Sequence, residues 1–193
     1  MLVVVKTMIK LLRLSFELVK IIVISLAIII PVRYFLIQPF YVKGASMEPN
    51  FSDSEYLIVD EISYRLGEPK RGDIIVFRYP PNPEEHFIKR IIGLPGEKVQ
   101  VKDGAVYVYN SDYSEGVSLS EPYLAPGTRT NSLHENIITL DDDEYFVLGD
   151  NRNSSKDSRT FGPVERKYIT GTVWIRGWPF DRFNIFGDQE YQF

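Results

Sequence analysis

Apolar residues are concentrated in one stretch near the start of the chain. Between Ile21 and Val32 the sequence IIVISLAIIIPV contains no charged residue, and apolar residues continue on both sides of it. A helix from about residue 18 to residue 38 would be roughly 30 Å long at 1.5 Å per residue, which matches the hydrocarbon core of a bilayer. The pattern predicts a cytoplasmic N-terminus and a single transmembrane anchor within residues 1–38.

A cleaved signal peptide and a buried core helix are the two other interpretations of this stretch. The small-residue cleavage site of a signal peptide would fall at Ala45, far beyond the apolar residues, and Lys43 stands where a second small residue is needed. A core helix would have a polar face, which the stretch lacks. A retained anchor therefore accounts for the pattern better than either alternative.

The charges around the apolar stretch predict its orientation. More basic residues precede it than follow it closely, so the positive-inside rule places the N-terminus in the cytoplasm and everything after Gln38 outside. The residues before the stretch also recur at helical spacing, which fits either an amphipathic segment on the membrane surface or an ordinary topology signal. The basic residues are Lys6, Lys10, Arg13 and Lys20 before the stretch, and Arg33 and Lys43 after it.

After residue 38 the pattern changes to short β-rich runs that are separated by turn residues. Val, Ile, Tyr and Phe dominate the runs, and breaks such as Pro95-Gly96 and Asp103-Gly104 suit hairpins. We predict an all-β domain over residues 39–193, with an inserted hairpin or long loop at about 110–143, where the sequence is polar. The expected strands are YLIVDE, DIIVFRYP, HFIKRII, KVQVK, AVYVYN, EYFVLG and TVWIRGW.

Composition and charge narrow the possible functions. The chain has 193 residues, of which 44% are hydrophobic and 13% aromatic, as in a folded protein. Its net charge is −4 and the part after Gly44 is acidic, so we expect no nucleic-acid partner.

The chain has no cysteine and lacks the metalloprotease, dinucleotide and P-loop motifs, so we predict neither a metal nor a cofactor. His86 and His134 are poorly placed for a catalytic triad, since one follows two glutamates and the other lies in a polar loop.

Two short stretches suggest nucleophilic chemistry without histidine. In the turn GASMEP, small residues before Ser46 let a substrate approach the hydroxyl and leave the Ser46 amide free to donate to an oxyanion. In the run FIKRII, the period of a strand puts Lys89 on the same apolar face as Phe87 and Ile91. Burial would lower the pKa of this lysine, which is the condition for it to act as a general base. Taken alone, a plain turn and an exposed edge-strand lysine remain the alternatives.

A third polar stretch completes a set of motifs that resembles a known family. GDNRNSSKDSR, from residue 149 to residue 159, is typical of a tight loop held by its own hydrogen bonds and ion pairs. In order after one apolar span, RYFLIQPFYVKGASMEPNF, RGDIIVFRYP, FIKRIIGLPGE and GDNRNSSKDSRTFGPV resemble the bacterial type I signal peptidases.

The resemblance implies a fold, an activity and partners. The expected fold is mainly β, with one N-terminal transmembrane helix and a catalytic domain of the LexA-like superfamily. The expected activity is that of a serine endopeptidase with a Ser-Lys dyad, which removes signal peptides from exported preproteins after small residues of the Ala-X-Ala type. Its partners would be these signal peptides and membrane lipid, and we expect a monomer in the plasma membrane.

The resemblance also implies roles for individual residues. Ser46 matches the nucleophile, Lys89 the neutral general base, and Ser155 a serine that hydrogen-bonds the lysine and orients it. The positions that brace the site through ion pairs are matched by Asp150, Arg90, Asp157 and Arg159. The positions that line shallow apolar pockets for the substrate are matched by Phe40, Val42, Met47, Val76 and Ile88.

Two positions depart from the family pattern, and two rival functions stay open. Gly44 stands where some members have a hydroxyl that donates to the oxyanion, and Asn50 where threonine is usual. A self-cleaving repressor of the LexA type would carry a DNA-binding domain and no membrane span. A non-catalytic, membrane-tethered binding protein would have no need to keep Ser46, Lys89 and Ser155.

Overall fold

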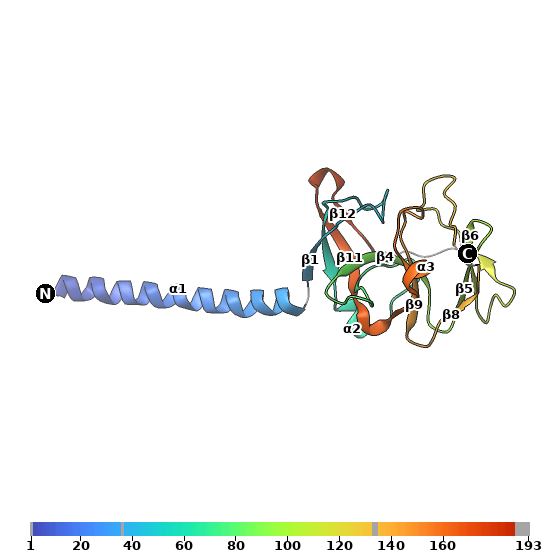
Figure 1. The fold of residues 1–193 in the computed structure, drawn as a ribbon. Helices are drawn as coiled ribbons and strands as arrows, with labels where there is room; N and C mark the ends of the chain where they lie inside the picture. Colours follow the sequence, from blue (N-terminus) through green and yellow to red (C-terminus); the bar gives the residue numbers. More distant parts are fainter. Residues whose placement is uncertain (1, 36, 133–134, 188–193) are drawn as a thin grey trace. The chain divides into compact units, whose positions relative to one another are not determined.

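The computed structural model describes residues 2–35, 37–132 and 135–187, with side chains described for residues 8–30 and from Gln38 onward within these ranges. The chain falls into two compact units, Met1–Gln38 and Pro39–Phe193 (Figure 1).

The first unit contains one long helix, α1 (Leu2–Phe35). Its described side chains are exposed along the whole length, including the apolar ones. Among the described residues, no helix combines the length and the apolar character that crossing a membrane requires. The span expected at residues 18–38 runs past Ile30 onto side chains that lie outside the described ones, and so does Lys6 of the basic cluster.

The second unit is mainly β, with two sheets among its described residues. The central pairs of the larger sheet are antiparallel, from β2 through β11, β3 and β4 to β9. In sheet order the strands are β1 (Ile37–Tyr41), β2 (Tyr56–Asp60), β11 (Ile169–Trp178), β3 (Ile74–Arg78), β4 (His86–Gly93), β9 (Glu144–Leu148) and β10 (Val164–Glu165), and β12 (Asn184–Ile185) pairs with β11.

The smaller sheet lies at the end of this unit away from β12 (Figure 1). Its order is β7 (Val117–Ser118), β6 (Ala105–Tyr109), β5 (Lys98–Lys102) and β8 (Ile138–Thr139). Both of its two-residue strands come from the stretch 110–143, which therefore completes a sheet at two points.

Every strand expected from the sequence is present, but the prediction of an all-β domain needs correction. Short helices interrupt the strands. At the start of α3, Asp157 caps the helix, since its side chain accepts a hydrogen bond from the backbone of Arg159. The helical turns are α2 (Ser63–Leu66), α3 (Ser158–Phe161), η1 (Arg166–Tyr168) and η2 (Phe180–Arg182).

Strands β3 and β4 have both faces covered, and this decides the surroundings of the site. Ile74 and Val76 of β3 belong to one apolar cluster, with Met47 and Phe51, whereas Ile75, next to them in sequence, belongs to another. Alternate residues of a strand point to opposite faces, so each face of β3 packs against its own core. A polar side chain on neighbouring β4 is consequently surrounded by protein on either side.

Candidate active site

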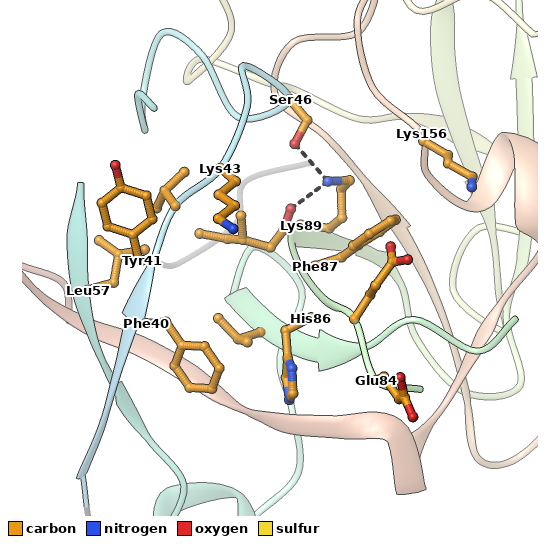
Figure 2. A pocket seen from close by; sticks show the side chains of 14 residues that line it. Phe40, Tyr41, Lys43, Ser46, Leu57, Glu84, His86, Phe87, Lys89 and Lys156 are labelled. Carbon is orange, nitrogen blue, oxygen red and sulfur yellow. Dashed lines mark hydrogen bonds between the residues drawn. The ribbon is translucent and has the colours of Figure 1, made fainter. Parts of the chain in front are cut away.

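A turn between β1 and β2 holds Ser46 against strand β4. Lys89 Nζ lies 2.8 Å from Ser46 Oγ and donates a second hydrogen bond of 2.7 Å to the carbonyl of Ile88 (Figure 2). Nζ is also 5.4 Å from the ring centre of Phe87, on the face of β4 that the alternation predicts. The two residues lie 43 positions apart in the chain. They meet because Met47, next to Ser46, packs in the same apolar cluster as Val76 of β3 and Ile88 of β4.

The environment of Lys89 favours the neutral amine. Its side chain is only 3% exposed, and this burial lowers its pKa to about 8 from an ordinary value of 10.5. The negative charges of Asp157 and Asp150 oppose the shift but do not cancel it. A buried cation loses hydration that distant carboxylates replace only in part, so the proton is held weakly. The lysine can therefore act as a base near neutral pH.

The loop after β9 packs directly on the turn that carries Ser46. A Cβ atom on Gly149 would lie 2.4 Å from the carbonyl oxygen of Ser46 and 2.1 Å from Ser155 Oγ, so only glycine fits at this position. The neighbouring Asn151 donates two hydrogen bonds to the turn, from its backbone to the carbonyl of Ser46 and from its side chain to the carbonyl of Ala45, each 3.0 Å long. Neither Gly149 nor Asn151 was among the residues assigned from the sequence.

Ser155 differs from the arrangement that the family resemblance implies. Its buried Oγ has no hydrogen-bond partner among the described residues, whereas the resemblance expects a hydrogen bond with Lys89. Lys89 Nζ instead contacts Ser46 Oγ and the carbonyl of Ile88.

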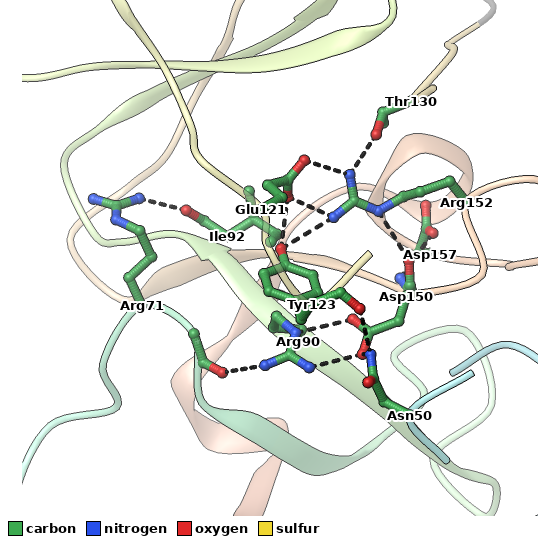
Figure 3. A network of polar contacts seen from close by, with 12 residues as sticks. Asn50, Arg71, Arg90, Ile92, Glu121, Tyr123, Thr130, Asp150, Arg152 and Asp157 are labelled. Atoms are coloured by element: carbon green, nitrogen blue, oxygen red, sulfur yellow. Dashed lines mark hydrogen bonds and ion pairs between the residues drawn. The ribbon is translucent and has the colours of Figure 1, made fainter. Parts of the chain in front are cut away.

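Arg90 and Asp150 form a buried ion pair behind the site (Figure 3). Arg90 Nε and Nη2 donate to the two carboxylate oxygens of Asp150 at 2.9 and 2.7 Å, which is the two-point geometry of a strong pair. The Arg90 guanidinium also lies 3.9 Å from the ring centre of Tyr123, and Asn50 Nδ2 donates to Asp150 at 2.8 Å. The pair fixes β4, which carries Lys89, to the start of the loop.

Asp157 and Arg159 form the second ion pair assigned from the sequence. Arg159 donates to both carboxylate oxygens of Asp157 at 2.8 Å. Asp157 also accepts a hydrogen bond of 3.1 Å from the backbone of Gly149, so it closes the loop on itself. Both pairs thus act on the backbone that contacts the Ser46 turn, and neither touches Ser46 Oγ.

Arg152 belongs to a third buried cluster, which sequence reasoning missed. It donates to both carboxylate oxygens of Glu121 at 2.8 and 2.5 Å, to Thr130, and to the carbonyl of Gly149 (Figure 3). These contacts hold the stretch 110–143 against the loop after β9. The sequence shows only an arginine inside a polar loop, and its partners in the segment 110–143 cannot be derived from that pattern.

A groove with a volume of about 590 Å³ opens beside Ser46 and Lys89. Four of the five residues expected to bind substrate line it: Phe40, Val42, Val76 and Ile88. The fifth, Met47, is 1% exposed and packs in the core below the turn. The same groove is also lined by charged and polar residues that were not among the expected substrate-binding residues, namely Lys43, Glu84, Glu85, His86 and Lys156.

His86 is a wall of the groove and makes no hydrogen bond to Ser46. Its ring packs on Phe40 with the centres 5.3 Å apart (Figure 2). Partial burial, with a smaller effect of Arg78, lowers its pKa below the usual value. His134 lies outside the described residues. Among the residues that are described, no three His, Asp or Glu side chains gather where they could hold a metal ion.

Fold and site together define a class of protein: a mainly β domain that holds a serine hydroxyl against a buried lysine, beside an apolar groove. A family model described as signal peptidase, peptidase S26, matches residues 15–178. The chain belongs to this family of serine endopeptidases.

Named relatives agree with the family model. The chain is 39% identical over 177 residues to a probable signal peptidase I-2 of Synechocystis sp., with 89% of this chain and 77% of the relative covered. It is 34% identical over 173 residues to the signal peptidase IB of Staphylococcus aureus strain Mu50, with 84% and 88% covered. A crystal structure of a signal peptidase I from Enterococcus faecalis V583 is 37% identical and matches 55% of this chain and 97% of that chain, with a TM-score of 0.45.

Proposed function

We propose that this enzyme removes signal peptides from exported preproteins, with Ser46 as nucleophile and Lys89 as general base. One observation carries the proposal: Lys89 Nζ lies 2.8 Å from Ser46 Oγ while the lysine is 3% exposed and its pKa is lowered to about 8. A hydroxyl becomes a useful nucleophile only when an adjacent base takes its proton, and a neutral amine within hydrogen-bonding distance meets that condition.

The reaction proceeds in two halves. Ser46 Oγ attacks the scissile carbonyl as its proton passes to Lys89 Nζ, and a tetrahedral oxyanion forms. The lysine ammonium then gives this proton to the leaving amine, the C–N bond breaks, and an acyl-enzyme remains. Lys89 next takes a proton from water, which attacks the acyl-enzyme, and it returns the proton to Ser46 Oγ as the signal peptide leaves.

The backbone amide of Ser46 is the oxyanion donor in this mechanism. No described residue accepts a hydrogen bond from it, so it is free to donate to the substrate. Gly44 has no hydroxyl to add a second donor. Ser155 serves Lys89 instead, because a neutral amine that accepts from Ser46 has an N–H to spare and Ser155 Oγ is buried without a partner.

The groove supports a substrate with small apolar residues before the cut, as at an Ala-X-Ala site. Phe40, Val42, Val76 and Ile88 offer an apolar surface, and large side chains would have to displace them from the core that they share with Met47. Cleavage after small residues follows from the shallowness of that surface.

We further propose that residues 1–38 anchor the enzyme in the plasma membrane, with the catalytic domain outside. The uncharged stretch between Ile21 and Val32 and the basic residues before it support this topology. Membrane lipid and signal peptides are then the partners, and the enzyme acts as a monomer. Addition of an external protease to spheroplasts tests the topology, since only an outward domain is degraded.

A non-catalytic binding protein and a LexA-type self-cleaving protease are the rival functions. A binding protein would not need a lysine that is buried against a serine at a cost in stability. A self-cleaving protease would cut its own chain and leave added substrate intact. Incubation of the purified enzyme with a preprotein separates the three, because the proposal expects cleavage of the preprotein and an intact enzyme.

The decisive experiment removes either the hydroxyl of Ser46 or the amine of Lys89 by substitution. We expect Ser46→Ala and Lys89→Ala each to lower turnover of a preprotein by about 10⁴-fold or more, because the nucleophile and its base act as one unit. Far-ultraviolet circular dichroism should show an unchanged fold. Substitution of the exposed Lys98 to alanine is the matched control and should leave turnover unchanged. Substantial activity in either reactive-site variant would refute the assigned roles.

A further inference from the structure

Asn151 contacts the Ser46 turn in a way that points beyond simple packing. Its backbone N–H donates to the carbonyl of Ser46, and its side-chain Nδ2 donates to the carbonyl of Ala45, which lies 106 positions away in the chain. The Ala45 carbonyl also accepts a hydrogen bond of 3.2 Å from the backbone of Glu48, within the turn itself. Two donors from different parts of the fold thus meet at one carbonyl oxygen.

That carbonyl shares a rigid unit with the proposed oxyanion donor. The C=O of Ala45 and the N–H of Ser46 belong to one trans peptide group, in which they point in opposite directions. A planar peptide group cannot turn one end without turning the other. The direction of the Ser46 N–H is therefore set by whatever holds the Ala45 oxygen.

We propose that the side chain of Asn151 is a positioning residue for the oxyanion donor, and that it acts by holding the Ala45 carbonyl so that the Ser46 N–H points at the developing oxyanion. This rests on the proposed function, in which that amide stabilises the tetrahedral intermediate. A hydrogen bond to the carbonyl also polarises the peptide group and strengthens its N–H as a donor. Because Gly44 contributes no hydroxyl, the direction of this one amide matters more than it would beside a second donor.

The two hydrogen bonds of Asn151 can be separated by substitution. The backbone bond to Ser46 is kept by any residue other than proline at position 151, so the turn stays attached to the loop after β9. Only the side-chain bond to Ala45 is lost in Asn151→Ala. In Asn151→Asp a carboxylate oxygen of the same shape replaces the donor and is repelled by the Ala45 oxygen.

The experiment compares these two variants with Asn153→Ala and Asn153→Asp, which make the same changes on an exposed side chain two positions further along. Each enzyme is assayed for kcat and KM on a signal-peptide substrate, and for the inhibition constant of a peptide aldehyde with the same residues before the cut. The aldehyde forms a tetrahedral adduct with a serine, so its affinity reports the oxyanion donor. All rates are measured at a temperature where circular dichroism shows each variant folded.

We expect Asn151→Ala to lower kcat by about tenfold, less than the 10²- to 10³-fold that removal of a whole donor costs, because the amide stays but loses its fixed direction. Asn151→Asp should be lower still. KM should change by less than about threefold, and the aldehyde should bind more weakly by the same factor as kcat/KM falls. The midpoint of the pH profile of Asn151→Ala should match that of the wild type, and both Asn153 variants should retain full activity.

Several outcomes would overturn the inference. Wild-type kcat in Asn151→Ala would do so, as would a raised KM with unchanged kcat, or a fall in kcat without weaker aldehyde binding. A shifted pH midpoint in Asn151→Ala would assign the residue to Lys89 instead. These outcomes differ from those that would refute the proposed function. An active Ser46→Ala enzyme would refute the mechanism itself. A fully active Asn151→Ala enzyme beside an inactive Ser46→Ala enzyme would refute only the role of Asn151.

Discussion

At the scale of single residues, Lys89 meets two opposing requirements. Burial of its side chain lowers its pKa to about 8, and this allows it to act as a base near neutral pH. The same burial removes hydration from the ammonium form and destabilises the folded state wherever that form persists. Activity and stability should therefore respond to this one side chain in opposite directions.

The pH profile of catalysis follows from the lowered pKa. The reaction needs the neutral amine, so kcat/KM should level off above about pH 8 and fall about tenfold for each pH unit well below it. Steady-state rates on a signal-peptide substrate between pH 5 and pH 10 provide the measurement. Constant activity down to pH 5 would mean that the base is not this lysine.

Replacement of Lys89 by methionine should stabilise the protein. The pKa of the folded state lies below the ordinary value of 10.5, so the unfolded state binds more protons between pH 8 and pH 10.5, and wild-type stability rises with pH across that window. We expect Lys89→Met to be more stable by on the order of 2 kcal/mol at pH 7, with a gain that shrinks toward pH 10.

Urea unfolding of wild type and variant at pH 7 and pH 10 measures this difference. The exposed Lys98 of β5, replaced by methionine, is the control and should show no such pH dependence. A gain that is equal at both pH values would show that packing, and not the buried charge, is responsible.

Individual site residues differed in how far the sequence could reveal them. Alternation along one strand was enough to put Lys89 on a buried face, because a single period of two decides the direction of its side chain. The burial of Met47 could not be derived, since it depends on the turn folding back onto the core of Phe51 and Val76. The role of Asn151 could not be predicted, because the sequence does not show which carbonyl groups accept the hydrogen bonds of an asparagine in a loop.

At the scale of elements, the site is a contact between a turn and a loop that come from opposite ends of the domain sequence. Gly149 has no side chain, so the backbones of the turn and the loop can lie in close contact. Hydrogen bonds to the carboxylates of Asp157 and Asp150 then hold the loop in place. Most of the longer strands were predictable, since each shows its own pattern, but the five-residue β1 was not expected. The two-residue strands β7, β8, β10 and β12 were not expected either, because two residues are too few for a pattern and tertiary pairing alone defines them.

Gly149→Ala should disable the enzyme without unfolding it. The new methyl group would lie 2.1 Å from Ser155 Oγ and 2.4 Å from the Ser46 carbonyl, so the turn must shift, and a shift of about 1 Å at a reacting group costs roughly 10²-fold in rate. Gly177→Ala on β11 is the control, because its methyl group would find its nearest neighbour 3.9 Å away. Turnover and thermal unfolding of both variants test this, and wild-type turnover of Gly149→Ala would contradict it.

At the scale of the whole molecule, the parts of the site lie in one compact unit. Ser46, Lys89, the loop after β9 and the groove all belong to Pro39–Phe193, which has its own cores. In the proposed function, chemistry and membrane attachment then belong to separate parts of the chain.

A chain that starts at residue 37, which keeps β1, should fold and cleave a short soluble peptide with kcat/KM within ~10-fold of the full-length enzyme, since a domain with its own core can fold alone. On a preprotein held in vesicles it should be slower, because it no longer shares the membrane with its substrate and loses that gain in effective concentration. Parallel assays with both substrates give the comparison, and Ser46→Ala in each chain length is the control. Equal loss on both substrates would show that residues 1–36 are needed for the domain itself.

The clamp of Arg152 on Glu121 and Thr130 bears on how such enzymes can be recombined. It makes the segment 110–143 and the loop after β9 electrostatically interdependent, although they are separate in sequence. A chimera whose imported segment lacks acceptors at positions 121 and 130 would leave a fully buried guanidinium without its partners. When segments are exchanged between homologues, residue 152 and segment 110–143 therefore have to be transferred together.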